Sequence, residues 1–294
     1  MNLKMQSLFR LSDKRNRLGL SKGAVMVAVI ALLVVGSVLL SNVAEGRKSL
    51  GQSDYLTPIQ REIERQRQRL ASADVEARRD ALMRLGNLKR PEASRTAAVG
   101  LNDPVPVVRV TAAHAVSSLP PHEVASLVAP LLKDKAEFVR REAAHVLGKA
   151  KAREAVAALV DTLNQDKQPS VRNAAAVALG QIGDESAVQA LAQVLSNPSQ
   201  NKKKKANPAN EFLLRSAARS LGQIRSRAAV PALITALENE HNVSDVRREA
   251  AIALGLIADP SALPALQAVY STAEDPYLSE AARMALRRIA RVKN

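Results

Sequence analysis

The sequence Val139-Arg140-Arg141-Glu142-Ala143-Ala144-His145-Val146-Leu147-Gly148 is repeated along this chain. Close copies begin at Val108, which lies 31 residues earlier, at Val171, which lies 32 residues later, and at Val246. Looser copies occupy residues 77–86, 213–222 and 277–286, which brings the number of copies to seven. A regular period of this size is typical of a repeat array, in which each unit packs on its neighbours instead of around one central core.

Each copy predicts an amphipathic helix. Counted from Arg140 as position 0, and from the matching residue in the other copies, the small and apolar residues fall at positions +3, +4, +7 and +8. This spacing places them on one side of a helix with 3.6 residues per turn. A second apolar pattern with helical spacing lies between copies, for example in residues 155–163. Each repeat is therefore predicted to be a pair of helices, and the fold class to be all-α.

An acidic residue recurs six positions before the arginine of three copies, namely Asp103, Asp134 and Asp166. This place is predicted to be the turn between the two helices, where a carboxylate can accept hydrogen bonds from free backbone N–H groups. Because the acidic and basic positions share one period, we expect them to lie side by side in successive repeats. The pattern is interrupted where other residues replace the aspartate or the arginine, and there we expect apolar packing to hold the junctions more than charge does. These replacements are Ser72, Pro208, His241, Leu214 and Leu278.

The repeated pattern resembles a known family. It reads Asp-x5-Val-Arg-x2-Ala-Ala-x2-Leu-Gly, followed by Ile182-Gly183-Asp184 and by a helix with Ala187 and Leu191. This is similar to HEAT repeats of the phycobilisome-lyase type, over about residues 57 to 291. The resemblance implies a right-handed α-solenoid of about seven HEAT helix pairs. Such arrays serve as scaffolds, adaptors, chromophore-lyase subunits and DNA glycosylases, so the resemblance does not select a function.

The N-terminal region predicts a membrane anchor. Residues 1–23 carry six lysines and arginines against one aspartate. Residues 24–44 follow without a charged side chain, and a helix of this length is about long enough to span a bilayer. A cleaved signal peptide is the alternative, although the apolar run is long for one. Residues 45–56 are predicted to be a tether, and residues 57–294 the solenoid. The basic leader places the N-terminus in the cytoplasm, so we expect a single-pass protein of the inner or plasma membrane with a periplasmic or extracellular solenoid.

One insertion breaks the period, because 42 residues separate Arg172 from Leu214. The extra residues fall in a segment, 197–210, that contains two Asn-Pro steps and four adjacent lysines, Lys202, Lys203, Lys204 and Lys205. This composition predicts an exposed loop. The loop either makes the protein more soluble or docks an acidic partner or an anionic lipid.

Composition excludes several classes of site. The chain has 294 residues, a formal net charge of +15 and no cysteine, which rules out disulfides, thiolate nucleophiles and cysteine-ligated metals. Much of the positive charge lies in the leader and the four lysines, and aromatic residues are not interleaved with basic ones, so nucleic acid is not the expected partner. His114 and His145 share position +5 in adjacent repeats, but two imidazoles do not make a metal site. We therefore expect no catalytic residue, no metal and no cofactor.

The remaining candidate surface consists of positions +1 and +5 of the second helices. In a HEAT array these helices usually line the concave side, so this surface predicts a groove that holds an extended or helical segment of a partner protein. A merely solvated face is the alternative. The candidate partner-binding residues are Arg79, Arg141, His145, Arg215, Arg219, Arg248 and Arg283, together with Lys202, Lys203, Lys204 and Lys205 of the insertion.

These features together predict a non-enzymatic, membrane-anchored scaffold or adaptor that displays a HEAT solenoid outside the cytoplasm. Its partners would be a protein in the groove and the membrane through residues 24–44. The alternatives are a lyase-like or chaperone-like HEAT subunit that acts on a partner protein, and a nucleic-acid-binding HEAT-like protein.

Overall fold

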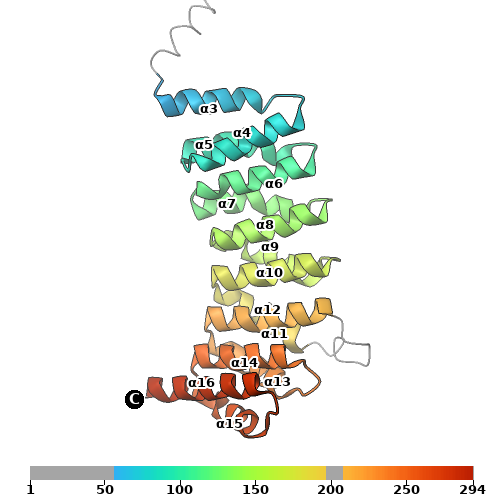
Figure 1. Cartoon of the computed structure of the whole chain (residues 1–294), viewed down its shortest axis with the longest axis vertical. Helices are drawn as coiled ribbons and strands as arrows, with labels where there is room; N and C mark the ends of the chain where they lie inside the picture. Colours follow the sequence, from blue (N-terminus) through green and yellow to red (C-terminus); the bar gives the residue numbers. More distant parts are fainter. Residues whose placement is uncertain (1–55, 197–207, 294) are drawn as a thin grey trace, which may run out of the picture. The chain divides into compact units, whose positions relative to one another are not determined.

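The computed structural model describes residues 56–196 and 208–293. In those residues it contains fourteen α-helices, several short 3-10 helices and no strand. The chain divides into two compact units, residues 1–62 and 63–294, and the boundary falls within helix α3. The second unit holds the repeats, and its helices follow one another in a stack of two layers (Figure 1).

The helices alternate between a first and a second helix in each of seven repeats, as the sequence predicts. The first helices are α3 Pro58–Arg69, α5 Pro91–Ala97, α7 Pro121–Val128, α9 Val156–Gln165, α11 Val188–Ser196, α13 Val230–Glu238 and α15 Leu263–Thr272. The second helices, nearest the viewer in Figure 1, are α4 Val75–Asn87, α6 Pro106–Ala115, α8 Glu137–Lys149, α10 Pro169–Ile182, α12 Pro208–Ile224, α14 Ser244–Ile257 and α16 Pro276–Lys293. The 3-10 helices are η2 Ala98–Asn102, η3 Val116–Ser118, η4 Ala129–Lys133, η5 Arg153–Ala155, η6 Glu185–Ala187, η8 Arg227–Ala229 and η9 Pro260–Ala262.

The core consists of the positions that the repeat pattern marks as small or apolar. Every residue at +3 and +4 of the second helices is buried, from Ala81 and Leu82 in α4 to Ala281 and Ala282 in α16. Position +7 is a buried leucine in most repeats, for example Leu147, which has no exposed surface. Burial of one such side chain contributes roughly 2 kcal/mol. The helical period read from the sequence is therefore confirmed.

Most second helices end in a residue with a left-handed backbone. Gly183 takes this conformation with φ 74°. In other repeats the same position is occupied by a residue with a side chain: Lys89, Lys151, Arg225 and Ala258. The next residue often caps the following 3-10 helix, as when Asp184 accepts a hydrogen bond from the backbone N–H of Ser186 at 3.0 Å. These turns join each second helix to the next repeat.

The predicted location in the inner or plasma membrane is contradicted. Among residues 56–196 and 208–293, no helix is both long and apolar enough to cross a bilayer. The longest, α16, has 18 residues and includes four arginines and a lysine, whereas a span needs about 20 mostly apolar residues. The leader 1–23, the segment 24–44 and tether residues 45–55 lie outside the described residues, as do residues 197–207 of the insertion.

Candidate partner-binding face

Three arginine–aspartate ion pairs join the first four repeats, and we call this set the Arg–Asp ladder. In each pair the arginine Nε donates to one carboxylate oxygen of the next repeat at 2.6–2.7 Å, and a second guanidinium nitrogen donates to the other oxygen. Bidentate pairs of this kind are among the stronger hydrogen bonds in proteins. The predicted alignment of the two columns is confirmed. The pairs are Arg78–Asp103, Arg109–Asp134 and Arg140–Asp166.

Each ladder aspartate also accepts a hydrogen bond from a backbone N–H in the turn before a second helix, as predicted. Asp134 accepts a hydrogen bond from the backbone N–H of Ala136 at 2.8 Å, at the start of α8. Burial by itself would raise the pKa of Asp134. The hydrogen bonds from Arg109 and Ala136 and the charges of Arg109 and Arg140 outweigh burial, so this pKa is lowered. The carboxylate therefore stays ionised in the folded protein at neutral pH.

Ion pairs from other positions join repeats five and six, in addition to the expected apolar packing, in which Leu214 is buried. Arg215 of α12 lies 3.2 Å from Asp245 of α14, and Arg219 makes two hydrogen bonds to Glu249 of α14. The hydrogen bond to Glu249 raises the pKa of Arg219, and burial opposes this effect. Ion pairs therefore link repeats five and six, although the arginine and the aspartate of the ladder are both replaced at this junction.

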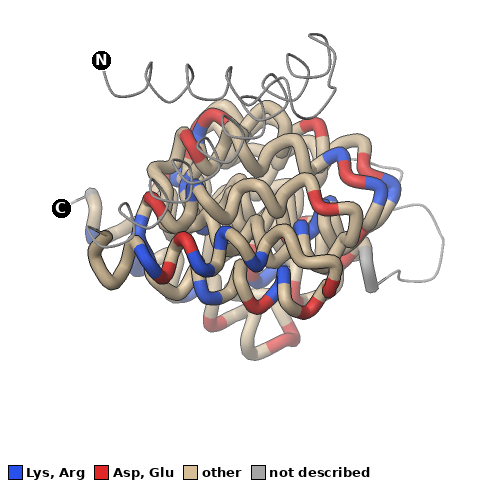
Figure 2. The backbone as a smooth tube through the Cα atoms, turned by 90° about the horizontal axis from the view of Figure 1, so that it is seen from above, with Lys and Arg blue, Asp and Glu red and all other residues tan. Residues whose placement is uncertain are grey.

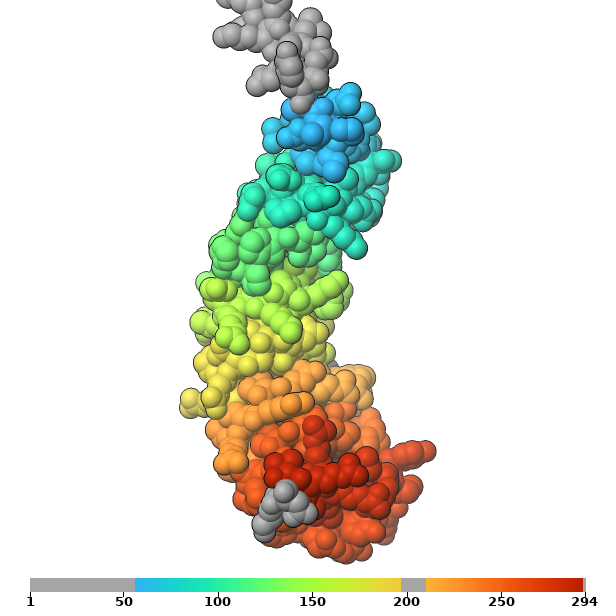
Figure 3. Space-filling model, turned by 90° about the vertical axis from the view of Figure 1, so that its left-hand side faces the viewer, coloured from blue at the N-terminus to red at the C-terminus, as the bar shows by residue number. Residues whose placement is uncertain are grey.

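The second helices present one continuous side of the unit, and Figure 3 shows that the stack bends with this side inward. We call positions −2, +1 and +5 of these helices the inner face. Positions −2 and +5 are seven residues apart and so lie on the same side of a helix. Five of the ten large apolar side chains exposed in the described residues belong to the inner face or border it at +6. They are Met83, Phe138, Phe212, Ile252 and Met284.

The six candidate arginines in the described residues all lie on the inner face, and each has a carboxylate partner. Two of these partners belong to the next repeat, as for Arg215 and Arg219, and the others belong to the same helix. The remaining pairs are Arg79–Glu76, Arg141–Glu142, Arg248–Asp245 and Arg283–Glu280. Basic and acidic residues accordingly lie next to one another in Figure 2. The inner face is therefore a neutralised surface with exposed apolar side chains.

The other candidates have simpler surroundings. His145 is exposed on α8, and Lys202, Lys203, Lys204 and Lys205 lie outside the described residues. His114, one repeat before His145, has its Nε2 atom 3.4 Å from Glu142. No group of three or more histidine, aspartate or glutamate side chains in the described residues could hold a metal ion.

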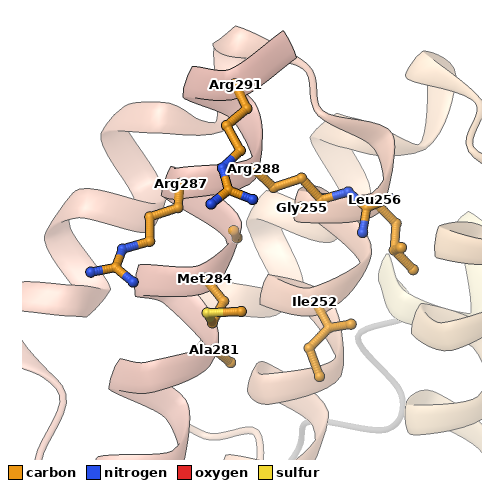
Figure 4. Close-up of a pocket in the computed structure, with 9 residues that line it drawn as sticks. Ile252, Gly255, Leu256, Ala281, Met284, Arg287, Arg288 and Arg291 are labelled. Atoms are coloured by element: carbon orange, nitrogen blue, oxygen red, sulfur yellow. The ribbon is translucent and has the colours of Figure 1, made fainter.

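A pocket that sequence reasoning missed lies between α14 and α16. Its volume is about 420 Å³, and Ile252 and Leu256 of α14 and Met284 of α16 supply its apolar lining (Figure 4). Three arginines of α16 complete it: Arg287, Arg288 and Arg291. In the sequence these cations look like charges that complement the C-terminal end of a helix. Only the packing of α16 on α14 shows that they flank an apolar pocket.

Phe212 contributes to a second, smaller pocket of about 270 Å³ between α12 and α14. The guanidinium of Arg215 lies 4.9 Å from the centre of the Phe212 ring, which fixes this exposed aromatic by a cation–π contact. Apolar and charged groups thus alternate at close range on the inner face.

The stack of helix pairs and its inner face define the class of an α-solenoid repeat protein. The family model of HEAT repeats matches residues 63–148, 127–207 and 203–287, so the chain belongs to the HEAT-repeat family. Comparison with curated proteins gives no match.

Several solved structures are similar to this chain, among them the following three. One subunit in the complex of CpcE and CpcF of phycocyanin lyase from a Nostoc species is 21% identical, with 80% of this chain and 95% of that chain covered and a TM-score of 0.45. Human deoxyhypusine hydroxylase in complex with glycerol is 22% identical, with 79% and 96% covered and a TM-score of 0.39. An engineered protein is 20% identical, with 78% and 97% covered and a TM-score of 0.38. Likenesses at this level carry no argument about activity or substrate.

Proposed function

We propose that this protein is a scaffold or adaptor that holds a segment of a partner protein against the inner face, and that it performs no chemistry itself. The observation that supports the proposal most is the alignment of exposed apolar side chains on the second helices. Met83, Phe138 and Phe212 are 48%, 40% and 52% exposed. Aligned apolar groups with polar neighbours are typical of surfaces that bind proteins.

The neutralised arginines fit this function. Because carboxylates on or beside the inner face already pair with the candidate arginines, a partner does not need a long run of one charge to bind there. The bend of the stack turns the second helices toward a shared centre, a geometry that suits an extended or helical segment. A nucleic acid would need a continuous basic track instead.

The test replaces three apolar side chains of the inner face. Each of Met83, Phe138 and Phe212 is about half exposed, so its burial by a partner contributes about 1 kcal/mol. The triple variant Met83→Ser, Phe138→Ser, Phe212→Ser is expected to weaken partner binding by about 3 kcal/mol, or about 100-fold. The partner is first identified by crosslinking in cells, and its affinity for the purified full chain is then measured by titration calorimetry.

The matched control removes an apolar group from the opposite layer. Val99 in η2 is 70% exposed, and it belongs to the 3-10 turn that extends the first helix α5. The variant Val99→Ser should bind the partner as the unchanged protein does. Equal loss in both variants, or none in the triple variant, would refute binding at the inner face.

A lyase-like or chaperone-like subunit is the second candidate function. It is supported by the resemblance of the repeated motif, including Ile182-Gly183-Asp184, to HEAT repeats of the phycobilisome-lyase type. It differs from a scaffold in one measurable respect. Incubation of the identified partner with catalytic amounts of this protein would change the partner covalently or refold it, whereas a scaffold only binds it in a fixed ratio.

A further inference from the structure

The strongest uncompensated charge on the described second helices lies at the C-terminal end of the stack. Arg287, Arg288 and Arg291 have no carboxylate within ion-pair distance among the described residues. The candidate arginines farther along the inner face are all paired, including Arg283 one turn earlier on the same helix. Arg287 is close enough to Glu280 for its charge to lower the pKa of that carboxyl group. Arg288 and Arg291 are thus the two guanidiniums of this cluster without a nearby carboxylate among the described residues, and they repel each other and favour a bound anion.

These guanidiniums adjoin an apolar pocket. Figure 4 shows Arg288 extending toward Leu256 of α14, and Arg291 extending back along α16, while Arg287 points to the other side of α16. Met284 and Ile252, which are 55% and 42% exposed, lie beside the arginines and supply the apolar part of the site. The volume of about 420 Å³ is at the small end of the range for binding pockets.

We propose that this pocket, called the C-terminal pocket below, binds an acidic segment of a partner protein. An aliphatic or aromatic side chain of the segment enters between Met284 and Ile252, and neighbouring aspartates or glutamates pair with Arg288 and Arg291. The proposal rests on the proposed function, because the pocket continues the inner face beyond Arg283. Charge complementarity selects this occupant, since carboxylates form bidentate pairs with guanidiniums.

A nucleic acid fits the same place poorly. None of the residues that line the pocket is aromatic, so bases would have no ring to stack on. A strand would also find only Arg288 and Arg291 for its phosphates, because Arg219, Arg248 and Arg283 are already paired with carboxylates. An acidic peptide needs only the local cluster.

The test selects binders for the full-length protein from a display library of random peptides about twelve residues long. We expect the unchanged protein to enrich peptides in which an aliphatic or aromatic residue adjoins two or more acidic residues. The variant Arg288→Glu, Arg291→Glu should lose this enrichment. An enriched peptide, measured by fluorescence anisotropy, should bind the variant at least about tenfold more weakly, and added salt should weaken its binding to the unchanged protein.

Two further variants separate a local effect from a general one. Lys149→Glu, Arg153→Glu makes the same change of charge at exposed positions in and after α8, and it should leave peptide affinity unchanged. Met284→Gln keeps the length of an exposed side chain but removes its apolar character, and it should weaken binding several-fold. Circular dichroism checks that each variant keeps its helical content.

The proposal is overturned if acidic peptides are not enriched, if Arg288→Glu, Arg291→Glu enriches the same peptides, or if a single-stranded oligonucleotide binds the cluster in preference to them. Such a result does not touch the proposed function, which depends on Met83, Phe138 and Phe212 at the other repeats. Conversely, the triple serine variant can fail to affect the partner while acidic peptides still bind the C-terminal pocket.

Discussion

Replacing Asp134 by alanine should destabilise the protein more than replacing any exposed carboxylate does, because Asp134 joins repeats two and three through the Arg–Asp ladder. Its side chain is 8% exposed, and that of Arg109 is 14% exposed. The substitution removes two hydrogen bonds from Arg109, both at 2.7 Å, and the cap on the N–H of Ala136 at 2.8 Å. Removing one member of a buried pair typically costs about 3–5 kcal/mol.

The expected cost lies at the lower end of that range. Arg109 keeps hydrogen bonds to the carbonyl oxygens of Asp103 and Pro104 at 2.8 and 3.1 Å, so its guanidinium is not left without partners. The free energy of unfolding should therefore fall by about 3 kcal/mol. Urea titration followed by circular dichroism at pH 7 measures this change. Hydrogen exchange should place the loss of protection in α6 and α8, since each repeat contacts only its neighbours.

The matched control is Glu280→Ala. Glu280 also pairs with an arginine, Arg283, but within one helix, and its side chain is 53% exposed. Exposed pairs contribute little because water and salt screen them. If Asp134→Ala costs no more than Glu280→Ala, the ladder does not hold the repeats together and the reasoning is refuted.

Three other outcomes can be tested in the same way. Because folding lowers the pKa of Asp134, its contribution to the free energy of unfolding is present above the unfolded pKa of about 3.9 and is lost as the pH falls through the folded value. The difference in stability between the unchanged protein and Asp134→Ala should therefore be constant from about pH 5 to 8, and urea titrations at acid pH should show it shrink. Gly148→Ala should cost about 1–3 kcal/mol in urea titrations, since a Cβ there would lie 2.7 Å from the Cα of Ala178 in α10; a neutral result would show that α8 and α10 can separate freely. Ala258→Gly should raise stability by about 0.5–1 kcal/mol, because φ is 59° at this position and glycine adopts it without strain; a lower melting temperature would contradict this.

The sequence alone was enough to predict the helix pairs and the ladder, because both depend on local spacing. Positions +3, +4 and +7 mark the buried side of each second helix whatever the neighbouring repeat is. The ladder follows because the acidic and basic positions share one period. The shared period predicts only that the two columns lie side by side, and Arg109 and Asp134, 25 residues apart, are one of the pairs that result.

The pairing of Arg215 and Arg219 could not be predicted, because it depends on how far one second helix is shifted along the next. The other inner-face arginines pair within their own helix, at a spacing that the sequence does contain. Arg219 at +5 meets Glu249 at +2 of the following repeat, a contact that joins residues 30 positions apart. The C-terminal pocket depends in the same way on the contact of α16 with α14. Spacing within one helix contains no information about that shift, so the partners of Arg215 and Arg219 are not visible in the sequence.

The bend of the stack has its cause in the small residues between the second helices. Position +8 is glycine in most repeats, and a Cβ added there would contact an alanine or serine of the next second helix. At Gly222, for example, the added Cβ would lie 2.8 Å from the Cα of Ala253. The second helices consequently pack more closely on one another than the first helices do. A stack that is shorter on one side bends toward that side, so the second helices come to lie on the inside. The same glycines that bring the backbones together thus gather the exposed apolar residues of separate repeats, such as Phe138 and Phe212, onto one surface that a single partner segment can span.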